Sequence, residues 1–523
     1  MNSITITILE TSDVHGNILP INYGSNEPAE VGLVKIATII KDEKKQNKNT
    51  ILVDNGDLIQ GTPLTYHYVR SRNKEINPMI KILNELHYDA AVIGNHEFNY
   101  GMDVLQQAIK ESSFPWLSAN ILHEETKIPF FGKPYKMIEL EEGVKIAILG
   151  VTTHYIPNWE NPEHIKHLVF EDALEVTKIW VEKIRKEEQP DVMIVSYHGG
   201  FEADLETGKP TEKATGENQG YRICQEVEGI DLLLTGHQHR SLVGRVNGVP
   251  IIQPSFNGQA IGKATITLSK NQNTWTISDS TTELLPVQSV EVDTEIEVLV
   301  RDYESETQQW LDKPIGKVIG DMTIDDPIKA RLQDNALVEF INKVQMSAAQ
   351  VSISNTALFN NVTKGFPENI TMRDVVSNYI YPNTLSVVRI SGNDLKEALE
   401  RSASYFILRD GKVEVNPSFT TPKPQHYNYD MWEGIEYIFD ITKPFGERVV
   451  HLTFKGEQID PNGEYDVVMN NYRAGGGGDY LMFKDKPIIK DIPLDMSELI
   501  ANYILERGTI EATVNNNWKV IWD

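Results

Sequence analysis

The fold of this chain is decided by the stretch Val92-Ile93-Gly94-Asn95-His96-Glu97-Phe98-Asn99. An apolar run from Ala90 to Ile93 predicts a buried strand, and Gly94 ends it. The polar residues that follow lie at the carboxyl end of that strand, where open α/β sheets bind their ligands. Because Asn95 offers an amide oxygen and His96 an imidazole, this strand end is a candidate functional site.

Around this stretch, the first half of the chain alternates strand patterns with helix patterns. Short apolar runs predict strands at residues 5–9, 51–53, 90–93, 144–151, 192–196 and 232–234. Apolar residues at helical spacing predict helices at residues 32–45, 78–87, 102–110, 174–186 and near Arg222. Hairpin-like runs follow over residues 243–252 and 260–285. The pattern favours a layered α/β domain whose later strands pair antiparallel.

The length of the chain favours two domains, because 523 residues exceed what one core usually supports. We expect a first domain over residues 1–290, a linker helix over 291–315 and a second domain over 316–523. The linker is acidic and helical in pattern, and Pro314 and Gly316 mark its end. The second domain mixes predicted helices (335–347, 392–402, 497–506) with predicted strands (385–390, 435–441, 465–469).

Composition and charge restrict the possible partners. The formal charge of −26 argues against a nucleic-acid polymer or an anionic membrane surface, although bound metals could still attract a small anion. The single cysteine, Cys224, excludes an internal disulfide and is expected to be an inert packing residue. The sequence shows neither a signal-peptide pattern nor a stretch that could span a bilayer, so we expect a cytoplasmic protein. An exported or cell-wall form with a trimmed leader is the alternative.

Four other predicted strands end in polar clusters of the same kind as Asn95-His96. In the second cluster, Gly56 permits a tight turn that aims Asp57 back over the sheet. The five strand ends together supply seven candidate metal ligands: Asp13, His15, Asp57, Asn95, His198, His237 and His239. Seven ligands are too many for one tetrahedral zinc and suit two divalent ions that share a carboxylate. Mixed imidazole and oxygen donors favour Mn, Zn, Fe or Co.

Each cluster alone would be weak support for a metal site. An Asp-x-His or His-x-His pair is more often a surface or core feature, but five polar clusters at strand ends, in this order, favour metal binding. The remaining histidines lie outside these clusters and are expected in packing or surface positions: His67, His87, His123, His154, His164, His167, His426 and His451.

The five clusters resemble the calcineurin-like metallophosphoesterases, whose motifs are D-x-H, GD, GNHE, H and GHxH. The second motif, residues 56–61, is similar to the nucleotidase branch and lacks the GDxVDRG pattern of protein Ser/Thr phosphatases. In the second half, Tyr381-Pro382-Asn383-Thr384, Asn470-Asn471-Tyr472-Arg473-Ala474 and the glycines before Asp479 resemble the substrate domain of bacterial 5'-nucleotidases. They are closer still to the bifunctional 2',3'-cyclic-nucleotide 2'-phosphodiesterase/3'-nucleotidases. The resemblance implies a four-layer α/β/β/α domain and an α+β substrate domain joined by a helix.

The resemblance also implies roles for single residues. One metal would be bound by Asp13, His15, Asp57 and His239, and the other by Asp57, Asn95, His198 and His237. His96 would contact the phosphate in the transition state, and Asn99 would orient its ring. In the second domain, Tyr381 and Tyr472 would sandwich the base, and Asn383 and Asp479 would contact base or ribose.

Two departures from the 5'-nucleotidase pattern bear on the substrate. Those enzymes carry aspartate where this chain has Asn99, and an arginine-containing Asn-Gly-Gly-Gly-Ile-Arg segment where it has residues 354–358. Both differences are similar to the cyclic-phosphodiesterase group. The sequence therefore predicts a monomeric enzyme that hydrolyses small nucleotides with two divalent metal ions, 2',3'-cyclic nucleotides first to 3'-nucleotides and then to nucleoside and phosphate. The alternatives are a 5'-nucleotidase or nucleotide-sugar hydrolase, and a non-catalytic nucleotide sensor.

Overall fold

The computed structural model describes all residues of the chain except Met1, Asn2, Trp159, Lys213, Asn273, Pro382, Pro422, Pro493 and Asp523. The chain divides into two compact units, Met1–Thr307 and Gln308–Asp523. Pro382, which belongs to the Tyr-Pro-Asn-Thr motif quoted above, lies outside the described residues.

The first unit is built around two six-stranded sheets. The first sheet has the order β16-β15-β1-β4-β5-β6, and its strands are β1 (Ser3–Thr11), β4 (Thr50–Asp54), β5 (Ala90–Val92), β6 (Trp116–Leu117), β15 (Ala260–Asn271) and β16 (Thr274–Pro286). In this sheet β1, β4, β5 and β6 run parallel, whereas β15 and β16 pair antiparallel at one edge. The predicted antiparallel pairing of the later strands is confirmed here.

The second sheet has the order β13-β14-β12-β11-β9-β8. Its strands are β8 (Tyr135–Glu139), β9 (Lys145–Thr152), β11 (Val192–His198), β12 (Leu232–Thr235), β13 (Ser241–Val246) and β14 (Val249–Pro254). The four central strands are parallel, and an antiparallel strand pairs with each edge. Both sheets therefore present several strand carboxyl ends, which is where the predicted ligands lie.

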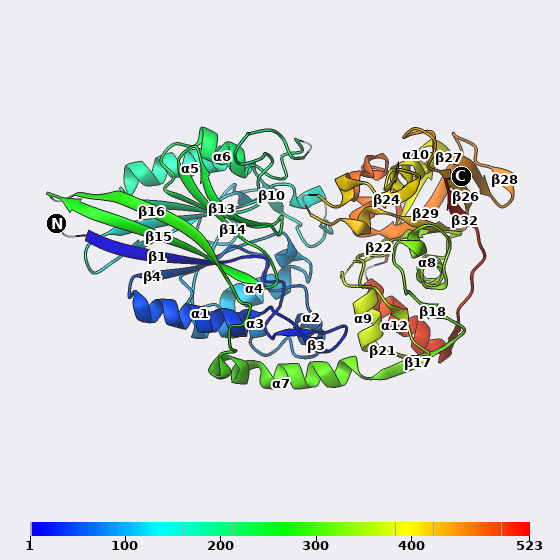
Figure 1. The fold of residues 1–523 in the computed structure, drawn as a ribbon, viewed down its shortest axis with the longest axis horizontal. Coiled ribbons are helices and arrows are strands. Elements are labelled where there is room, and N and C mark those ends of the chain that lie inside the picture. Colours follow the sequence, from blue (N-terminus) through cyan, green and yellow to red (C-terminus); the bar gives the residue numbers. More distant parts are fainter. Residues whose placement is uncertain are drawn as a thin grey trace. The chain divides into compact units, whose positions relative to one another are not determined.

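The two sheets and the helices of the first unit form four layers (Figure 1). Helices α1 (Leu33–Gln46) and α3 (Pro78–Glu85) lie on one side, and α5 (Ala173–Glu187) and α6 (Gly220–Glu226) on the other. The main core lies between the sheets, with apolar residues contributed by both: Ile8, Val53, Ile194 and Leu234. A second core packs the other face of the second sheet against α5. The predicted α/β/β/α fold is confirmed.

Helix α2 (Pro63–Ser71) is one element that the sequence patterns above do not predict. The helix is short and several of its residues are aromatic, so its sequence shows little helical periodicity of apolar residues. Its start signal is present, however. Thr62 accepts a hydrogen bond from the backbone N–H of Thr65, and Pro63 occupies the first helical position. α4 (Met102–Glu111), by contrast, lies where its pattern predicts.

Helix α7 (Thr294–Leu311) lies within residues 291–315, where a linker helix is expected, and the boundary between the two units falls inside this helix, after Thr307. Asp293, which lies just before the first turn, forms an ion pair with Lys41 at 2.6 Å. Farther along the helix, the Tyr303 hydroxyl donates a hydrogen bond to the Ile76 carbonyl at 2.9 Å. Near its other end, Asp312 pairs with Arg373 at 2.6 Å. Each end of the helix is thus tied to the unit to which it belongs.

The second unit mixes helices and sheets, as predicted. Its largest sheet has the order β25-β19-β29-β22-β30, with β19 (Ile353–Thr356), β22 (Leu385–Ser391), β25 (Met431–Glu433), β29 (Glu464–Asn470) and β30 (Ile488–Ile492). A four-stranded sheet contains β26 (Glu436–Asp440), β27 (Val449–Phe454), β28 (Glu457–Gln458) and β32 (Trp518–Ile521). The main helices are α8 (Ala336–Ala349), α9 (Met372–Asn378), α10 (Gly392–Ala403) and α12 (Met496–Arg507).

Within the part of the chain that the structure describes, no helix combines the length and the apolar character needed to cross a bilayer.

Candidate active site

The seven candidate ligands follow the carboxyl ends of five parallel strands of the two sheets. Asp13 and His15 come after β1, Asp57 after β4, and Asn95 after β5. His198 is the last residue of β11, and His237 and His239 come after β12. Since these ends lie at one edge of the stacked sheets, ligands far apart in sequence are brought together.

The backbone at these positions is unusual. Five of the seven candidate ligands have a positive φ: Asp13 (53°), His15 (49°), Asp57 (57°), His237 (65°) and His239 (58°). Left-handed backbone is uncommon for residues other than glycine and tends to cluster at functional sites, where surrounding contacts hold it. The fold thus accepts local strain in order to aim these side chains at one another.

Glycines allow the strand ends to approach closely. Gly56 has a φ of +94°, and a Cβ there would lie 2.6 Å from the backbone nitrogen of Gly94. A Cβ at Gly94 would lie 2.3 Å from Oδ1 of Asp57. The predicted tight turn at Gly56 is therefore present, and the two turns can meet only because both positions are glycine.

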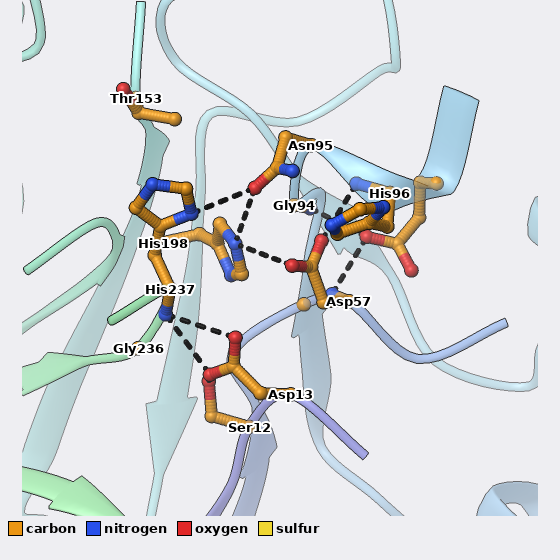
Figure 2. Close-up of polar contacts among 12 residues, drawn as sticks. Ser12, Asp13, Asp57, Gly94, Asn95, His96, Thr153, His198, Gly236 and His237 are labelled. Atoms are coloured by element: carbon orange, nitrogen blue, oxygen red, sulfur yellow. Dashed lines mark hydrogen bonds and ion pairs between the residues drawn. The ribbon is translucent and has the colours of Figure 1, made fainter. Parts of the chain in front are cut away.

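One group of donors contains Asp57, His198 and His237, with Asn95 beside them (Figure 2). Oδ1 of Asn95 lies 3.2 Å from Nε2 of His198 and 2.9 Å from Nδ1 of His237. Nε2 of His198 also lies 3.2 Å from Oδ2 of Asp57. Two imidazoles and two oxygen donors thus converge within hydrogen-bond distance.

The second group contains Asp13, His15 and His239. The two Nε2 atoms of His15 and His239 are 3.0 Å apart, and Nε2 of His239 lies 3.5 Å from Oδ1 of Asp13. Oδ2 of Asp57 is 4.0 Å from Nε2 of His15, so the Asp57 carboxylate lies within reach of both groups. The groups divide the residues as the resemblance does, and metal binding itself stays a prediction.

Hydrogen bonds outside the two groups determine which ring nitrogens face inward. Nδ1 of His198 lies 2.7 Å from the Asn55 carbonyl, and Nε2 of His237 lies 2.8 Å from Oε1 of Glu217. Carbonyl and carboxylate oxygens only accept, so these nitrogens donate. Nε2 of His198 and Nδ1 of His237 then face Asn95 and Asp57, and in the neutral rings these two nitrogens would offer their lone pairs to a metal ion. Such outer partners are typical of metal-binding histidines, and the donor set fits two divalent cations.

The charges of the centre favour a cation. Burial, with the neighbouring His239, lowers the pKa of His15 to about 3, which keeps that ring neutral. Burial would raise the pKa of Asp57, but the imidazoles of His198 and His96 hold it well below its ordinary value. Burial would lower the pKa of His198, yet the Asp57 carboxylate raises it to about 10. The buried carboxylate therefore binds positive charge, as a proton or as a metal ion.

Glu97 is a buried residue of the centre for which sequence reasoning proposed no role. Its carboxylate accepts from the backbone N–H groups of Asp57 at 2.8 Å, Leu58 at 2.6 Å and Gly94 at 2.7 Å. Burial, with the nearby Asp57, raises the pKa of Glu97. This side chain joins the loops after β4 and β5. Its position beside His96 in the opening stretch was the available signal.

His96 and Asn99 lie together beside the two donor groups (Figure 2 shows His96). The backbone N–H of His96 donates to Oδ1 of Asp57 at 2.7 Å, and Nδ1 of its ring lies 2.6 Å from Oδ1 of Asn99. Nδ2 of Asn99 donates to Oε2 of Glu160 at 2.7 Å. Asn99 is thus placed to orient the His96 ring. Glu160 and Glu217 were missed because they lie in loops without a recognisable motif.

The predicted base-binding residues lie in the second unit. The rings of Tyr381 and Tyr472 are each in contact with a third ring, Tyr427, with centroids 6.0 and 6.3 Å apart and interplanar angles of 75° and 73°. Phe359 packs edge-on against Tyr381 at 5.4 Å. Sequence reasoning did not identify Tyr427, which lies in a short helical turn, His426–Asn428.

The glycine run next to Tyr472 provides room for that ring. A Cβ at Gly477 would lie 2.6 Å from the Tyr472 ring, and one at Gly478 would lie 2.2 Å from Oδ1 of Asn428. Asp479 lies 3.5 Å from Nη2 of Arg401. The backbone N–H of Asn383 donates to the Tyr381 carbonyl at 2.8 Å, which forms a tight turn. Close approach of this run to a ligand stays a prediction.

A further acidic group lies in the second unit. The carboxylates of Asp334, Glu339 and Glu433 are buried and lie within 4.8 Å of one another. Burial raises the pKa of Asp334 to about 6, and burial raises that of Glu433 to about 7, each with help from neighbouring carboxylates.

Comparison with known families gives two matches. Residues 6–241 match the calcineurin-like phosphoesterase family, and residues 314–485 match the 5'-nucleotidase C-terminal domain. A crystal structure from Staphylococcus aureus, described as that of a provisionally assigned 5'-nucleotidase, is 34% identical, with a TM-score of 0.91 over 99% of this chain and 100% of that one.

Curated relatives are more distant in sequence but extend over nearly the whole chain. The 2',3'-cyclic-nucleotide 2'-phosphodiesterase/3'-nucleotidase of Salmonella typhimurium is 28% identical over 99% of this chain and 89% of its own length. The trifunctional nucleotide phosphoesterase protein YfkN of Bacillus subtilis is 28% identical over 99% of this chain, which spans only 39% of that relative.

Proposed function

The chain belongs to the calcineurin-like phosphoesterases that carry a 5'-nucleotidase C-terminal domain, and we propose that it opens 2',3'-cyclic nucleotides to 3'-nucleotides and then releases nucleoside and phosphate. The names of the Salmonella and Bacillus relatives support a nucleotide phosphoesterase. Asn99 supports the cyclic-phosphodiesterase group, since the 5'-nucleotidase pattern places aspartate at that position.

The observation that carries this proposal is the convergence of two donor groups at one shared carboxylate, Asp57, next to His96. Asp13, His15, Asp57 and His239 would hold one divalent ion, and Asp57, Asn95, His198 and His237 the other. Imidazole and oxygen donors together favour Mn, Zn, Fe or Co. Two such ions would neutralise phosphoryl oxygens and lower the pKa of a water molecule between them.

The chain's own residues would then do three things. Glu97 holds the loops after β4 and β5 at a fixed spacing through backbone hydrogen bonds. Asn99 holds the His96 ring by its Nδ1 atom, which leaves Nε2 for the substrate. A positioned imidazole that donates to the leaving ribose oxygen accelerates such reactions by about 10²–10⁴-fold.

The second unit would recognise the nucleoside. We assign base stacking to Tyr381 and Tyr472, and contacts with base or ribose to Asn383 and Asp479. Stacking on tyrosine tolerates different bases and contributes about 1–3 kcal/mol per base. The fit of Gly477 against the Tyr472 ring supports this assignment, because it fixes that ring without a bulky neighbour on that side.

A 5'-nucleotidase is the second candidate function. It is favoured by the Staphylococcus aureus structure, which is described as a provisionally assigned 5'-nucleotidase. At 34% identity this structure is more similar in sequence than the two curated relatives named above, at 28%. The absence of an arginine from residues 354–358 argues against it, since the 5'-nucleotidase pattern supplies an arginine to the substrate there.

The two candidates are separated by comparing kcat/KM for 2',3'-cyclic AMP, 3'-AMP and 5'-AMP in one preparation. We expect the first two to be hydrolysed at least tenfold more efficiently than 5'-AMP. The protein stripped with a chelator should hydrolyse none of them and should recover with Mn²⁺ or Zn²⁺. A preference for 5'-AMP would refute the first assignment and favour the second.

A further inference from the structure

A chain of hydrogen bonds leads from His96 to a buried carboxylate. Nδ1 of His96 lies 2.6 Å from Oδ1 of Asn99, and Nδ2 of Asn99 donates to Oε2 of Glu160 at 2.7 Å. The other oxygen of Glu160 accepts from the backbone N–H of Asn161 at 2.8 Å and lies 3.0 Å from Nδ1 of His164. Glu160 is only 8% exposed, so these partners hold its carboxylate in place.

The Glu160 carboxylate determines which groups donate and which accept along this series of hydrogen bonds. An ionised carboxylate accepts and does not donate, so Asn99 must direct its NH₂ group at Glu160. The amide oxygen of Asn99 then faces His96, and Nδ1 of that ring must carry a hydrogen. Without Glu160, the amide of Asn99 could turn over and present its NH₂ group to Nδ1, which would disfavour the doubly protonated ring that can also donate from Nε2.

We propose that Glu160 is a positioning residue for hydrolysis, which fixes the amide of Asn99 and thereby holds Nδ1 of His96 as a hydrogen-bond donor and orients the ring. The inference rests on the proposed function, because His96 is taken as the group that meets the substrate. In the 5'-nucleotidase pattern, an aspartate at position 99 accepts directly from the histidine. In this chain the Glu160 carboxylate is placed behind Asn99, whose side-chain amide bonds to the His96 ring on one side and to Glu160 on the other.

The consequence for the reaction concerns the leaving group. A water oxygen forms a bond to phosphorus and gives up one proton to solvent. The bond from phosphorus to the ribose oxygen breaks, and its electron pair stays on that oxygen. The ribose oxygen takes a proton from Nε2 of the doubly protonated His96 ring, whose Nδ1–H stays hydrogen-bonded to Asn99, and the ring regains its proton from solvent. Esters of 4-nitrophenol need no such proton, because 4-nitrophenolate is a stable leaving group. A fault in the relay should therefore affect nucleotides and spare nitrophenyl esters.

Exchanging the two polar groups tests the relay directly. Asn99→Asp alone places a carboxylate next to Glu160, where the two charges repel. Glu160→Gln alone removes the group that fixes the Asn99 amide. In the double variant the new amide at position 160 donates to the new carboxylate at position 99, which in turn accepts from His96. Glu163→Gln, an exposed position in the same loop, is the matched control.

We expect each single variant to lower kcat for the preferred nucleotide by about 10–100-fold, with KM and metal content within twofold of the wild type. The double variant should recover to within about fivefold, as coupled residues do in a double-mutant cycle. All variants should hydrolyse bis(4-nitrophenyl) phosphate within about threefold of the wild type, and Glu163→Gln should match it on every substrate.

The proposal is overturned if the double variant is no better than the worse single variant, if Glu160→Gln is fully active, or if nitrophenyl and nucleotide rates fall together. The cycle is run on whichever nucleotide the wild type hydrolyses fastest. If that nucleotide is 5'-AMP, the substrate assignment fails while the relay is still tested.

Discussion

At the scale of single residues, the centre depends on strained backbone held by its neighbours. Asp57 and His237 each have a left-handed φ, and the backbone N–H of His237 donates to both oxygens of Asp13 at 3.0 Å. Left-handed backbone costs on the order of 1 kcal/mol or more for a residue other than glycine. Glycine is required where two such turns meet, as at Gly56 and Gly94.

Gly56→Ala should therefore disrupt the centre more than backbone strain alone explains. The new Cβ would lie 2.6 Å from the Gly94 nitrogen and 2.9 Å from Nδ1 of His198. We expect kcat/KM to fall by at least 100-fold and the bound metal to fall below two per chain by elemental analysis. Gly143→Ala is the control, because its φ is also positive and the described residues leave the space around it open within 4 Å. Equal losses in the two variants would contradict the crowding argument.

Glu217 should affect metal affinity without touching the metal. Its carboxylate accepts from Nε2 of His237 at 2.8 Å, so Nδ1 of that ring keeps its lone pair. Removal of such an outer partner typically weakens metal binding by about 10–100-fold. We expect Glu217→Ala to weaken metal binding by this factor when the protein, freed of metal with a chelator, is titrated with Zn²⁺ or Mn²⁺. The exposed Glu206→Gln is the comparison, and unchanged affinity in Glu217→Ala would refute the outer role.

Functional residues could be predicted from the sequence where a reactive side chain directly follows the pattern of a strand. Asp57, Asn95 and His198 each follow an apolar run, so a strand end and a ligand are identified in one step. Glu160 and Glu217 could not be found in this way. They lie in irregular loops, and only the tertiary fold places them against Asn99 and His237.

At the scale of elements, the buried acidic group of the second unit links three of them. Asp334 precedes α8, Glu339 lies in the first turn of α8, and Glu433 ends β25. The backbone N–H of Asn515 donates to Glu339, and its side chain donates to Glu433. The segment before β32 is thus fastened to α8 and β25 through two buried carboxylates.

This group should make the stability of the protein depend on pH. Burial raises the pKa of Glu433 to about 7, whereas an unfolded glutamate has a pKa near 4.3. The folded state therefore binds more protons between these values, and stability falls as pH rises from about 4 to 7. Above pH 7 the loss is complete.

Glu433→Gln should remove that loss, because an amide keeps the hydrogen bonds without the charge. We expect the variant to be more stable than the wild type at pH 8 by on the order of 1–3 kcal/mol, or roughly 2–10 °C in Tm, and equally stable near pH 4.5. Calorimetry at both pH values checks this, with the exposed Glu436→Gln as control. A gain of the same size at both pH values would contradict the pH argument.

Helices and strands whose apolar residues follow a clear helical or strand pattern could be predicted from the sequence, and elements without such a pattern could not. β9, β11 and α5 lie where apolar runs and helical spacing place them, because tertiary packing and local pattern agree there. β8 and β19 were not predicted. β8 is half-buried, so its pattern is weak, and β19 is the polar sequence Ile353-Ser354-Asn355-Thr356, whose burial is set by its neighbours in the sheet.

At the scale of the whole molecule, chemistry and base recognition are assigned to different units. Every candidate metal ligand lies in Met1–Thr307, and every candidate base-binding residue in Gln308–Asp523. The net charge of −26 provides no general attraction for an anionic nucleotide, so metal ions and aromatic rings must supply the affinity.

Tyr472→Ala tests this division of roles. Loss of one stacking ring costs about 1–3 kcal/mol, so we expect KM for nucleotides to rise by about 5–100-fold. The kcat/KM for bis(4-nitrophenyl) phosphate, which has no base, should stay within about twofold. Tyr465→Ala, an aromatic position on β29 outside the tyrosine group, is the control. Parallel losses on both substrates would show that Tyr472 serves the fold instead of the base.

The order of the two proposed hydrolysis steps can be followed by ³¹P NMR, with 2',3'-cyclic AMP as substrate and the metal-loaded enzyme. We expect the cyclic resonance to give 3'-AMP first and inorganic phosphate second, with both steps lost in Asp57→Asn and in the chelated protein. Formation of 2'-AMP, failure to open the cyclic ester while 5'-AMP is hydrolysed, or turnover that survives removal of the metals would contradict the proposed function.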